Sequence, residues 1–283
     1  MAQAAEIGRQ GKIDLKVKTW RFGVFVAIHQ KLTFETASFL QIFLKAYDIF
    51  SHACFLTCRM IPVSAKIIDF YKSLEPPSLP KGIEILFPQK NKEVIKLVEL
   101  FFSKFYHDEK KRHLIFGINP GRFGAGTTGI NFTAPKQLKE FCGIDHPFKS
   151  QTELSAEFIY DFIEAYGGVK KFYREYFITS VSPLGFIKDG VNLNYYDDKK
   201  LQQAVVPFIT TSIQKQISLG FQTDHCICIG GDKNLKFFSA LNNEHKFFKK
   251  IIPLPHPRFI MQYRRKQKEK YIYQYLSTLR AVS

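Results

Sequence analysis

The sequence predicts an α/β protein in which a parallel sheet is covered by helices on both faces. Two observations predict this class. Short apolar segments, typical of buried strands, alternate along the chain with segments whose apolar residues recur at helical spacing. Turn sequences rich in glycine and proline separate these segments, and no repeat or low-complexity tract interrupts the pattern.

Four apolar segments are expected as strands, and they cover residues 112–118, 176–181, 225–229 and 251–254. The first ends at Asn119-Pro120-Gly121, the second at Ser182-Pro183 and the fourth at Pro255, which are sequences that a strand does not continue.

Helical spacing predicts a short helix over residues 64–74 and a longer one over 92–106, separated by an extended proline-rich linker. Another helix is expected around residues 158–166, where two glycines end it. A further helix covers 205–217, and Pro207 either opens or kinks it. Gly230-Gly231-Asp232 opens the next helix. A basic amphipathic helix closes the chain, with an apolar face made of Tyr271, Ile272, Tyr275, Leu276 and Leu279.

Residues 1–62 differ from the rest of the chain. They contain the only tryptophan, mixed charge and few capping or turn signals. We therefore treat residues 1–62 as an N-terminal extension of unknown role and residues 63–283 as the α/β domain.

The amino-acid composition indicates the kind of partner and the cellular compartment of the protein. The chain of 283 residues is 45% hydrophobic, which excludes a disordered protein, and its net charge of +16 favours a polyanion such as nucleic acid. The five cysteines match neither a zinc site nor an iron–sulfur cluster, as is typical of a reducing compartment. No segment is long and apolar enough to span a bilayer. We expect no membrane association, and a location in the cytoplasm at a bacterial nucleoid or in a eukaryotic nucleus.

Two polar side chains follow predicted strands. Asn119 comes directly after the first strand, and His256 follows the fourth strand between two prolines. Because the carboxyl ends of parallel strands meet at one edge of a sheet, Asn119 and His256 are expected to line one cleft.

A glycine-rich segment, Gly124-Ala-Gly126-Thr-Thr-Gly129, matches the G-x-G-x-x-G pattern of dinucleotide sites. In that motif the glycines follow the strand at once and open a helix, whereas here Pro120 and four other residues intervene. A nucleotide-cofactor enzyme remains an alternative on this pattern.

Basic and apolar residues are interleaved after His256. Basic side chains contact phosphates, and apolar side chains inserted between bases deform a duplex. The residues expected to contact DNA here are Arg258, Phe259, Ile260, Met261, Arg264, Arg265 and Lys266. A non-catalytic nucleic-acid-binding module would show the same pattern.

Several of these segments resemble the motifs of one family. Gly117-Ile-Asn-Pro-Gly-Arg-Phe-Gly with Thr128-Gly-Ile-Asn-Phe132 resembles the first motif of the uracil-DNA glycosylase superfamily, in its single-strand-selective monofunctional (SMUG-like) branch. Glu153-Leu-Ser155, residues 177–184 and Leu254-Pro-His-Pro257 resemble its other motifs. The resemblance implies a three-layer α/β/α fold with a central four-stranded parallel sheet.

The resemblance also implies roles for individual residues. Asn119 would hold the water that attacks the sugar, and His256 would stabilise the negative charge of the departing base. Phe132 would stack on the flipped base, and backbone groups of Ile118 and Phe123 would bind its edge.

Three positions depart from the family pattern. Ser180 stands where the family has a pyrimidine-recognising asparagine, and a rotating hydroxyl predicts weaker discrimination for uracil. Arg258-Phe-Ile-Met261 replaces the family's wedge, and Arg122 replaces a proline, adding an expected phosphate contact.

We therefore predict a monofunctional DNA glycosylase that excises uracil or other deaminated bases, including xanthine and hypoxanthine, in base excision repair. We expect DNA as the partner, a monomeric chain, and no metal or organic cofactor. A lyase acting through a lysine is a variant of this prediction.

Overall fold

A computed structural model describes residues 17–20, 23–26 and 61–282. The chain divides into two units, Met1–Arg59 and Met60–Ser283. In the first unit the described residues form strands β1 (Val17–Trp20) and β2 (Gly23–Val26), which pair antiparallel. The rest of the predicted N-terminal extension, up to residue 60, lies outside the described residues.

The second unit is built on a four-stranded parallel sheet. Its order is β5-β4-β8-β9, so the first predicted strand lies inside the sheet. The strands are β4 (His113–Gly117), β5 (Tyr176–Ser180), β8 (His225–Ile229) and β9 (Lys250–Leu254). All four strands were predicted, and the fold class is confirmed.

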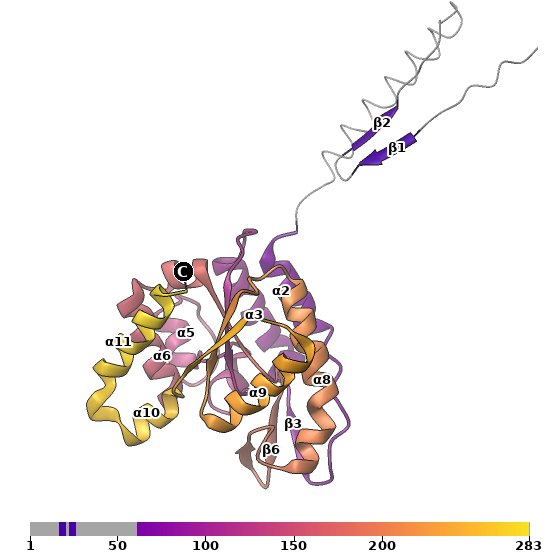
Figure 1. Cartoon of the computed structure of the whole chain (residues 1–283). Helices are drawn as coiled ribbons and strands as arrows, with labels where there is room; N and C mark the ends of the chain where they lie inside the picture. The colour runs from indigo at the N-terminus through magenta and orange to yellow at the C-terminus, as the bar shows by residue number, and fades with distance from the viewer. Residues whose placement is uncertain (1–16, 21–22, 27–60, 283) are drawn as a thin grey trace, which may run out of the picture. The chain divides into compact units, whose positions relative to one another are not determined.

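Helices cover both faces of this sheet (Figure 1), as right-handed crossovers require. One layer contains α5 (Pro135–Glu140), α6 (Leu154–Tyr166), α10 (Pro257–Tyr263) and α11 (Lys268–Arg280). The other contains α2 (Val63–Lys72), α3 (Lys92–Phe105), α8 (Lys199–Ser218) and α9 (Asp232–His245). The shorter helices are η1 (Pro88–Lys90), α4 (Ala125–Thr128), α7 (Val169–Glu175) and η2 (Arg265–Gln267).

Helix α8 begins two turns earlier than predicted. The Asp198 carboxylate caps it by accepting the backbone N–H groups of Lys200 at 2.8 Å and Leu201 at 3.0 Å. Pro207 lies inside the helix, so the alternative that it opens the helix is wrong.

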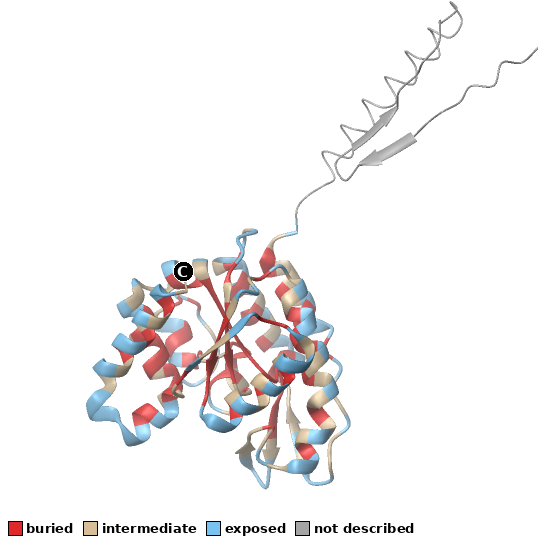
Figure 2. Ribbon diagram, in the orientation of Figure 1, coloured by how far each residue is buried: buried red, intermediate tan, exposed pale blue. Residues whose placement is uncertain are grey.

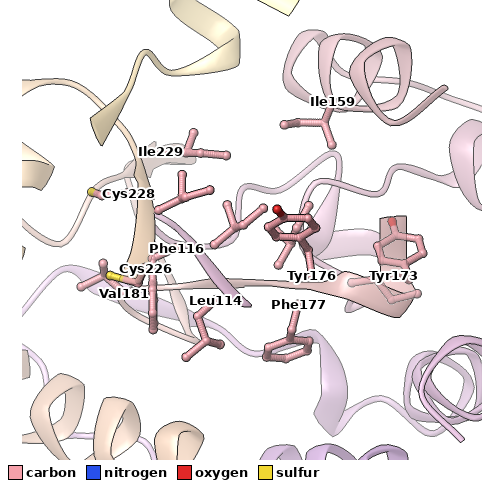
Figure 3. Close-up of a cluster of buried hydrophobic side chains, with 14 of the residues drawn as sticks. Leu114, Phe116, Ile159, Tyr173, Tyr176, Phe177, Val181, Cys226, Cys228 and Ile229 are labelled. Atoms are coloured by element: carbon pink, nitrogen blue, oxygen red, sulfur yellow. The ribbon is translucent and has the colours of Figure 1, made fainter. Parts of the chain in front are cut away.

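The core lies between the sheet and the two helical layers. Buried residues follow the strands and the inner faces of the helices (Figure 2). The buried hydrophobic cluster includes Leu114, Phe116 and Phe177 of β4 and β5 and, from the helical layer, Ile159 of α6 (Figure 3). This packing makes the sheet a rigid base for the loops at its carboxyl edge.

A second, antiparallel sheet was not predicted. It has the order β3-β6-β7 and consists of β3 (Ile83–Leu86), β6 (Gly185–Lys188) and β7 (Val191–Leu193). Because β7 ends at Leu193, this sheet delivers residues 192–196 to the carboxyl edge of the parallel sheet, where the candidate site lies.

Candidate active site

A cavity of about 420 Å³ opens at the carboxyl edge of the parallel sheet. It is lined by the segment after β4, the segment after α4, the loop after β7 and the segment after β9. Glu153 before α6 and Ser180 at the end of β5 also line it. The lining residues include Ile118, Asn119, Asn131, Phe132, Glu153, Ser180, Asn192, Asn194, Tyr196, His256, Arg258, Phe259 and Tyr263. Asn119 and His256 therefore line one cleft.

The carboxamide of Asn119 is held by the loop after β7. Its Oδ1 accepts the backbone N–H of Tyr195 at 3.2 Å, and its Nδ2 donates to the carbonyls of Leu193 and Pro120, each at 3.3 Å. Both amide hydrogens are therefore used in hydrogen bonds, and the second lone pair of Oδ1 is the remaining acceptor position of the side chain. Asn119 is thus oriented to accept one more hydrogen bond, as it would from a water molecule.

His256 caps α10 and is neutral. Its Nδ1 accepts the backbone N–H of Arg258 at 3.1 Å, so the proton of the neutral ring lies on Nε2. Burial and, to a smaller extent, the Arg258 charge lower the pKa of His256 to about 4. Near neutral pH the ring is a hydrogen-bond donor through Nε2 and carries no charge.

Phe132 lies beside His256, with the two ring centroids 6.0 Å apart. Its backbone has a φ of 54°, which is unusual for a residue with a side chain. The ring lies so close to β4 that a Cβ at Gly117 would be 2.7 Å from Phe132 Cε2. Gly117 is thus required for the position of the aromatic ring in the cavity wall.

The Ser180 hydroxyl is not free to rotate, contrary to our expectation from the sequence. It donates to Oδ1 of Asn131 at 2.6 Å, and both residues line the cavity. Nδ2 of Asn131 lies 3.4 Å from the buried Tyr71 hydroxyl.

Helix α10 separates the predicted DNA contacts into two groups. Ile260 and Met261 are 0% and 5% exposed, because helical spacing turns them toward α6. The prediction that they contact DNA is therefore wrong. Phe259, by contrast, is 43% exposed at the cavity rim. One turn later lies Tyr263, which was not among the predicted contacts; it is 66% exposed, and the two ring centroids are 5.8 Å apart.

The remaining predicted residues lie outside the cavity. The Arg122 guanidinium stacks on the exposed Phe123 ring at 5.0 Å, and neither residue lines the main cavity. Phe123 instead lines a neighbouring hollow together with Arg258. Arg264, Arg265 and Lys266 are exposed on the segment after α10.

Sequence reasoning assigned no role to Glu153, whose carboxyl group lines both the cavity and the hollow. Burial raises its pKa, and the nearby Arg258 charge opposes this effect. Its sequence signal was its place in Glu153-Leu-Ser155, a segment that resembles a motif of the family. Asn192 and Asn194, which also line the cavity, carried no local signal because their sheet was not predicted.

The glycine-rich segment serves packing. A Cβ at Gly124 would be 2.8 Å from the Glu153 carboxyl carbon, and one at Gly129 would be 2.7 Å from Val94 and Val98. A carboxylate repels phosphate, so these contacts disfavour the nucleotide-cofactor alternative.

No metal-binding group of three or more His, Cys, Asp or Glu side chains occurs in the described part of the chain. None of the described helices is long and apolar enough to cross a membrane.

Comparison with known proteins agrees with this geometry. Residues 104–280 match the model of the uracil DNA glycosylase superfamily. The fold is similar to the crystal structure of wild-type Pedobacter heparinus SMUG2, with a TM-score of 0.76, 45% sequence identity, and coverage of 79% of this chain and 99% of that chain. No curated protein sequence matches the chain. The SMUG-like resemblance is confirmed: the chain belongs to the uracil DNA glycosylase superfamily, and it is a DNA glycosylase.

Proposed function

We propose that this enzyme flips a deaminated base out of DNA into the cavity and hydrolyses its N-glycosidic bond, in base excision repair. The observation that carries the proposal is the shared cavity of Asn119, His256 and Phe132. A base inside a duplex is out of reach, so enzymes of this kind extrude it into a pocket. The cavity volume of about 420 Å³ lies within the usual range for small-molecule sites, about 300–1,000 Å³.

The nucleophile is a water molecule held by Asn119. A carboxamide does not take up a proton near neutral pH, so Asn119 acts by position rather than as a base. Its anchored Oδ1 accepts one water O–H and directs the oxygen toward the sugar carbon C1′ as the glycosidic bond breaks. No lysine is among the described residues that line the cavity, which favours hydrolysis without lyase chemistry.

His256 stabilises the leaving base. As the bond to the sugar breaks, the base gains negative charge, and a fixed donor aimed at that charge lowers the barrier. The Nε2–H of neutral His256 is such a donor, because the Arg258 backbone holds the other ring nitrogen. Phe132 next to it offers a flat face for the base to stack on.

Phe259 is the candidate wedge that fills the gap left by the flipped base. It is exposed at the cavity rim, one residue from the basic side chain of Arg258. Apolar side chains inserted into a base stack are a common device for deforming a duplex. Arg258 would bind a phosphate beside it.

A panel of oligonucleotides tests the proposal. Each carries one uracil, xanthine or hypoxanthine, in single- and double-stranded form, and alkali cleaves the strand wherever a base has been removed. We expect cleavage for at least one lesion, and no covalent enzyme–DNA product on treatment with borohydride. Tight, salt-sensitive binding without cleavage of any lesion would instead identify a non-catalytic binding module. A trapped covalent product would indicate a lyase.

A further inference from the structure

One residue of the loop after β7 makes hydrogen bonds in two directions. The backbone N–H of Tyr195 donates to Oδ1 of Asn119 at 3.2 Å. The hydroxyl of the same residue donates to Oδ1 of Asn234, in the first turn of α9, at 2.6 Å. Asn234 is buried and does not line the cavity. Tyr195 therefore joins the side chain that would hold the attacking water to a side chain inside the core.

The contacts of Asn234 fix its orientation. Its Nδ2 lies 3.3 Å from the carbonyl oxygen of Ile229 and 3.3 Å from Sγ of Cys228. Because a carbonyl only accepts hydrogen bonds, the nitrogen of the amide faces β8 and the oxygen faces Tyr195. Burial raises the pKa of the Tyr195 phenol, so the hydroxyl keeps the proton that it donates. Each polar atom of the two side chains thus has a partner.

These bonds attach the loop to the parallel sheet. Ile229 ends β8, which lies next to β4 in the sheet, and Asn119 follows β4. By contrast, β7 is an edge strand of only three residues in the small sheet. The Tyr195 ring also packs against Phe237 of α9, with the ring centroids 4.7 Å apart. The end of β8 therefore supplies a rigid reference point for the loop.

Gly230 makes room for this attachment. A Cβ at Gly230 would be 2.7 Å from Nδ2 of Asn234, so a side chain there would displace the amide. The backbone N–H of Gly230 donates to the carbonyl of Leu254 at 3.1 Å, two residues before His256. A glycine that was expected only to open a helix thus also lets Asn234 lie against the end of the strand.

We propose that Tyr195 and Asn234 are positioning residues, which hold the loop so that Asn119 presents its remaining lone pair to the attacking water. This inference rests on the proposed function. The carboxamide of Asn119 bonds to backbone groups of Leu193, Tyr195 and Pro120, so it moves with the loop. A misplacement of about 1 Å, caused far from the reacting atoms, can slow a reaction by about 100-fold. Asn234 does not line the cavity, so the effect should fall on base release rather than on DNA binding.

The test uses Tyr195→Phe, which removes the hydroxyl and keeps the ring. Single-turnover release of the lesion that the wild type excises fastest should slow by about 10- to 100-fold, with unchanged affinity for lesion DNA. Asn234→Ala should act in the same direction. Tyr106→Phe is the matched control, because Tyr106 is also buried and donates to the carbonyl of Tyr176, at the start of β5. It should release bases at nearly the wild-type rate. All rates are measured well below the Tm of each variant.

Double variants separate positioning from a general loosening of the fold. If Tyr195 acts through Asn119, adding Tyr195→Phe to Asn119→Ala should slow release no further. Added to His256→Gln, Tyr195→Phe should still slow release by its full factor. Losses that multiply with Asn119→Ala, or wild-type release by both Tyr195→Phe and Asn234→Ala, would overturn the inference. Equal slowing by Tyr106→Phe would overturn it as well.

Failure of the proposed function gives a different result. A wild-type enzyme that excises no lesion would overturn the proposed function and the positioning roles together. The positioning roles alone fail when the wild type excises a lesion and the single or double variants give the contrary results above.

Discussion

The protonation state of His256 decides what its ring contributes to the reaction. Nδ1 accepts a backbone N–H, and this contact would be lost if Nδ1 carried a proton. The lowered pKa of about 4 keeps the ring neutral through the physiological range. In the proposed mechanism, the electrostatic help to the leaving base therefore comes from a fixed N–H dipole rather than from a cation.

We predict that His256 makes stability sensitive to acid. Its pKa falls from 6.5 in the unfolded chain to about 4 in the folded one. The folded state thus binds fewer protons between these values, and the full stability present above pH 6.5 is lost as the pH falls toward 4. Wild-type Tm should fall more between pH 7.5 and 4.5 than that of His256→Gln. The rate of base excision should not fall as the pH is lowered through 6.5. A fall of the rate near pH 6.5 would contradict a neutral ring.

Glu153 is expected to have the opposite effect on stability. Burial raises its pKa, so the folded state favours the protonated carboxyl, and stability falls as the pH rises past the unfolded value of 4.5. Glu153→Gln should therefore have a higher Tm than the wild type at pH 8, with the difference shrinking at pH 4. Thermal unfolding at both values checks this. An unchanged or lower Tm at pH 8 would show that the carboxylate is well compensated by Arg258.

The elements at the carboxyl edge show what the sequence could and could not predict. The four parallel strands are short apolar runs bounded by turn sequences, so their existence and the meeting of Asn119 with His256 followed directly. The strands of the second sheet are only three or four residues long and partly exposed, which is too short for their apolar residues to form a recognisable strand pattern. The loop that holds the Asn119 carboxamide comes from that sheet, so its role was missed.

Helix α10 shows a different cause of error. Composition alone placed Phe259, Ile260 and Met261 in one DNA-contacting group, but the phase of a seven-residue helix separates them. Ser180 was identified from its motif, while its partner Asn131 was not, because their contact joins residues 49 positions apart. Sequence patterns predict the helices and strands, whereas contacts between side chains on different elements become visible only in the folded structure.

The position of Phe259 on α10 predicts a wedge effect that depends on the substrate. Phe259→Ala should reduce excision from duplex DNA by about tenfold. Separating two stacked base pairs costs about a few kcal/mol, and the inserted Phe259 ring would offset part of that cost. Excision from single strands should change little, since no stack is opened. Tyr273→Ala removes another exposed aromatic ring, 70% exposed, from α11 and is the control. Equal losses on both substrates would argue against a wedge.

At the scale of the whole molecule, the basic charge is expected to act through phosphates. The net charge is +16, and Arg264 and Arg265 are exposed on the segment that directly follows Tyr263. Replacing both by Gln should weaken DNA binding for all sequences alike. The logarithm of the DNA-binding constant falls linearly with the logarithm of the salt concentration, with a slope of about −0.9 for each phosphate contact. Loss of two contacts should therefore make this slope shallower by about two. Lys110→Gln/Lys111→Gln, before β4 at the opposite end of the sheet, is the control. Equal slopes in all three proteins would contradict this interface.

In the proposed mechanism, Asn119 positions the attacking water in a cavity that it shares with His256. Single-turnover base release by Asn119→Ala, measured beside DNA affinity, tests it most directly, with the exposed Asn243→Ala as the matched control. We predict that release slows by about 100-fold or more, the scale of losing precise positioning, while affinity for lesion DNA stays near that of the wild type. Wild-type release by Asn119→Ala would contradict the claim.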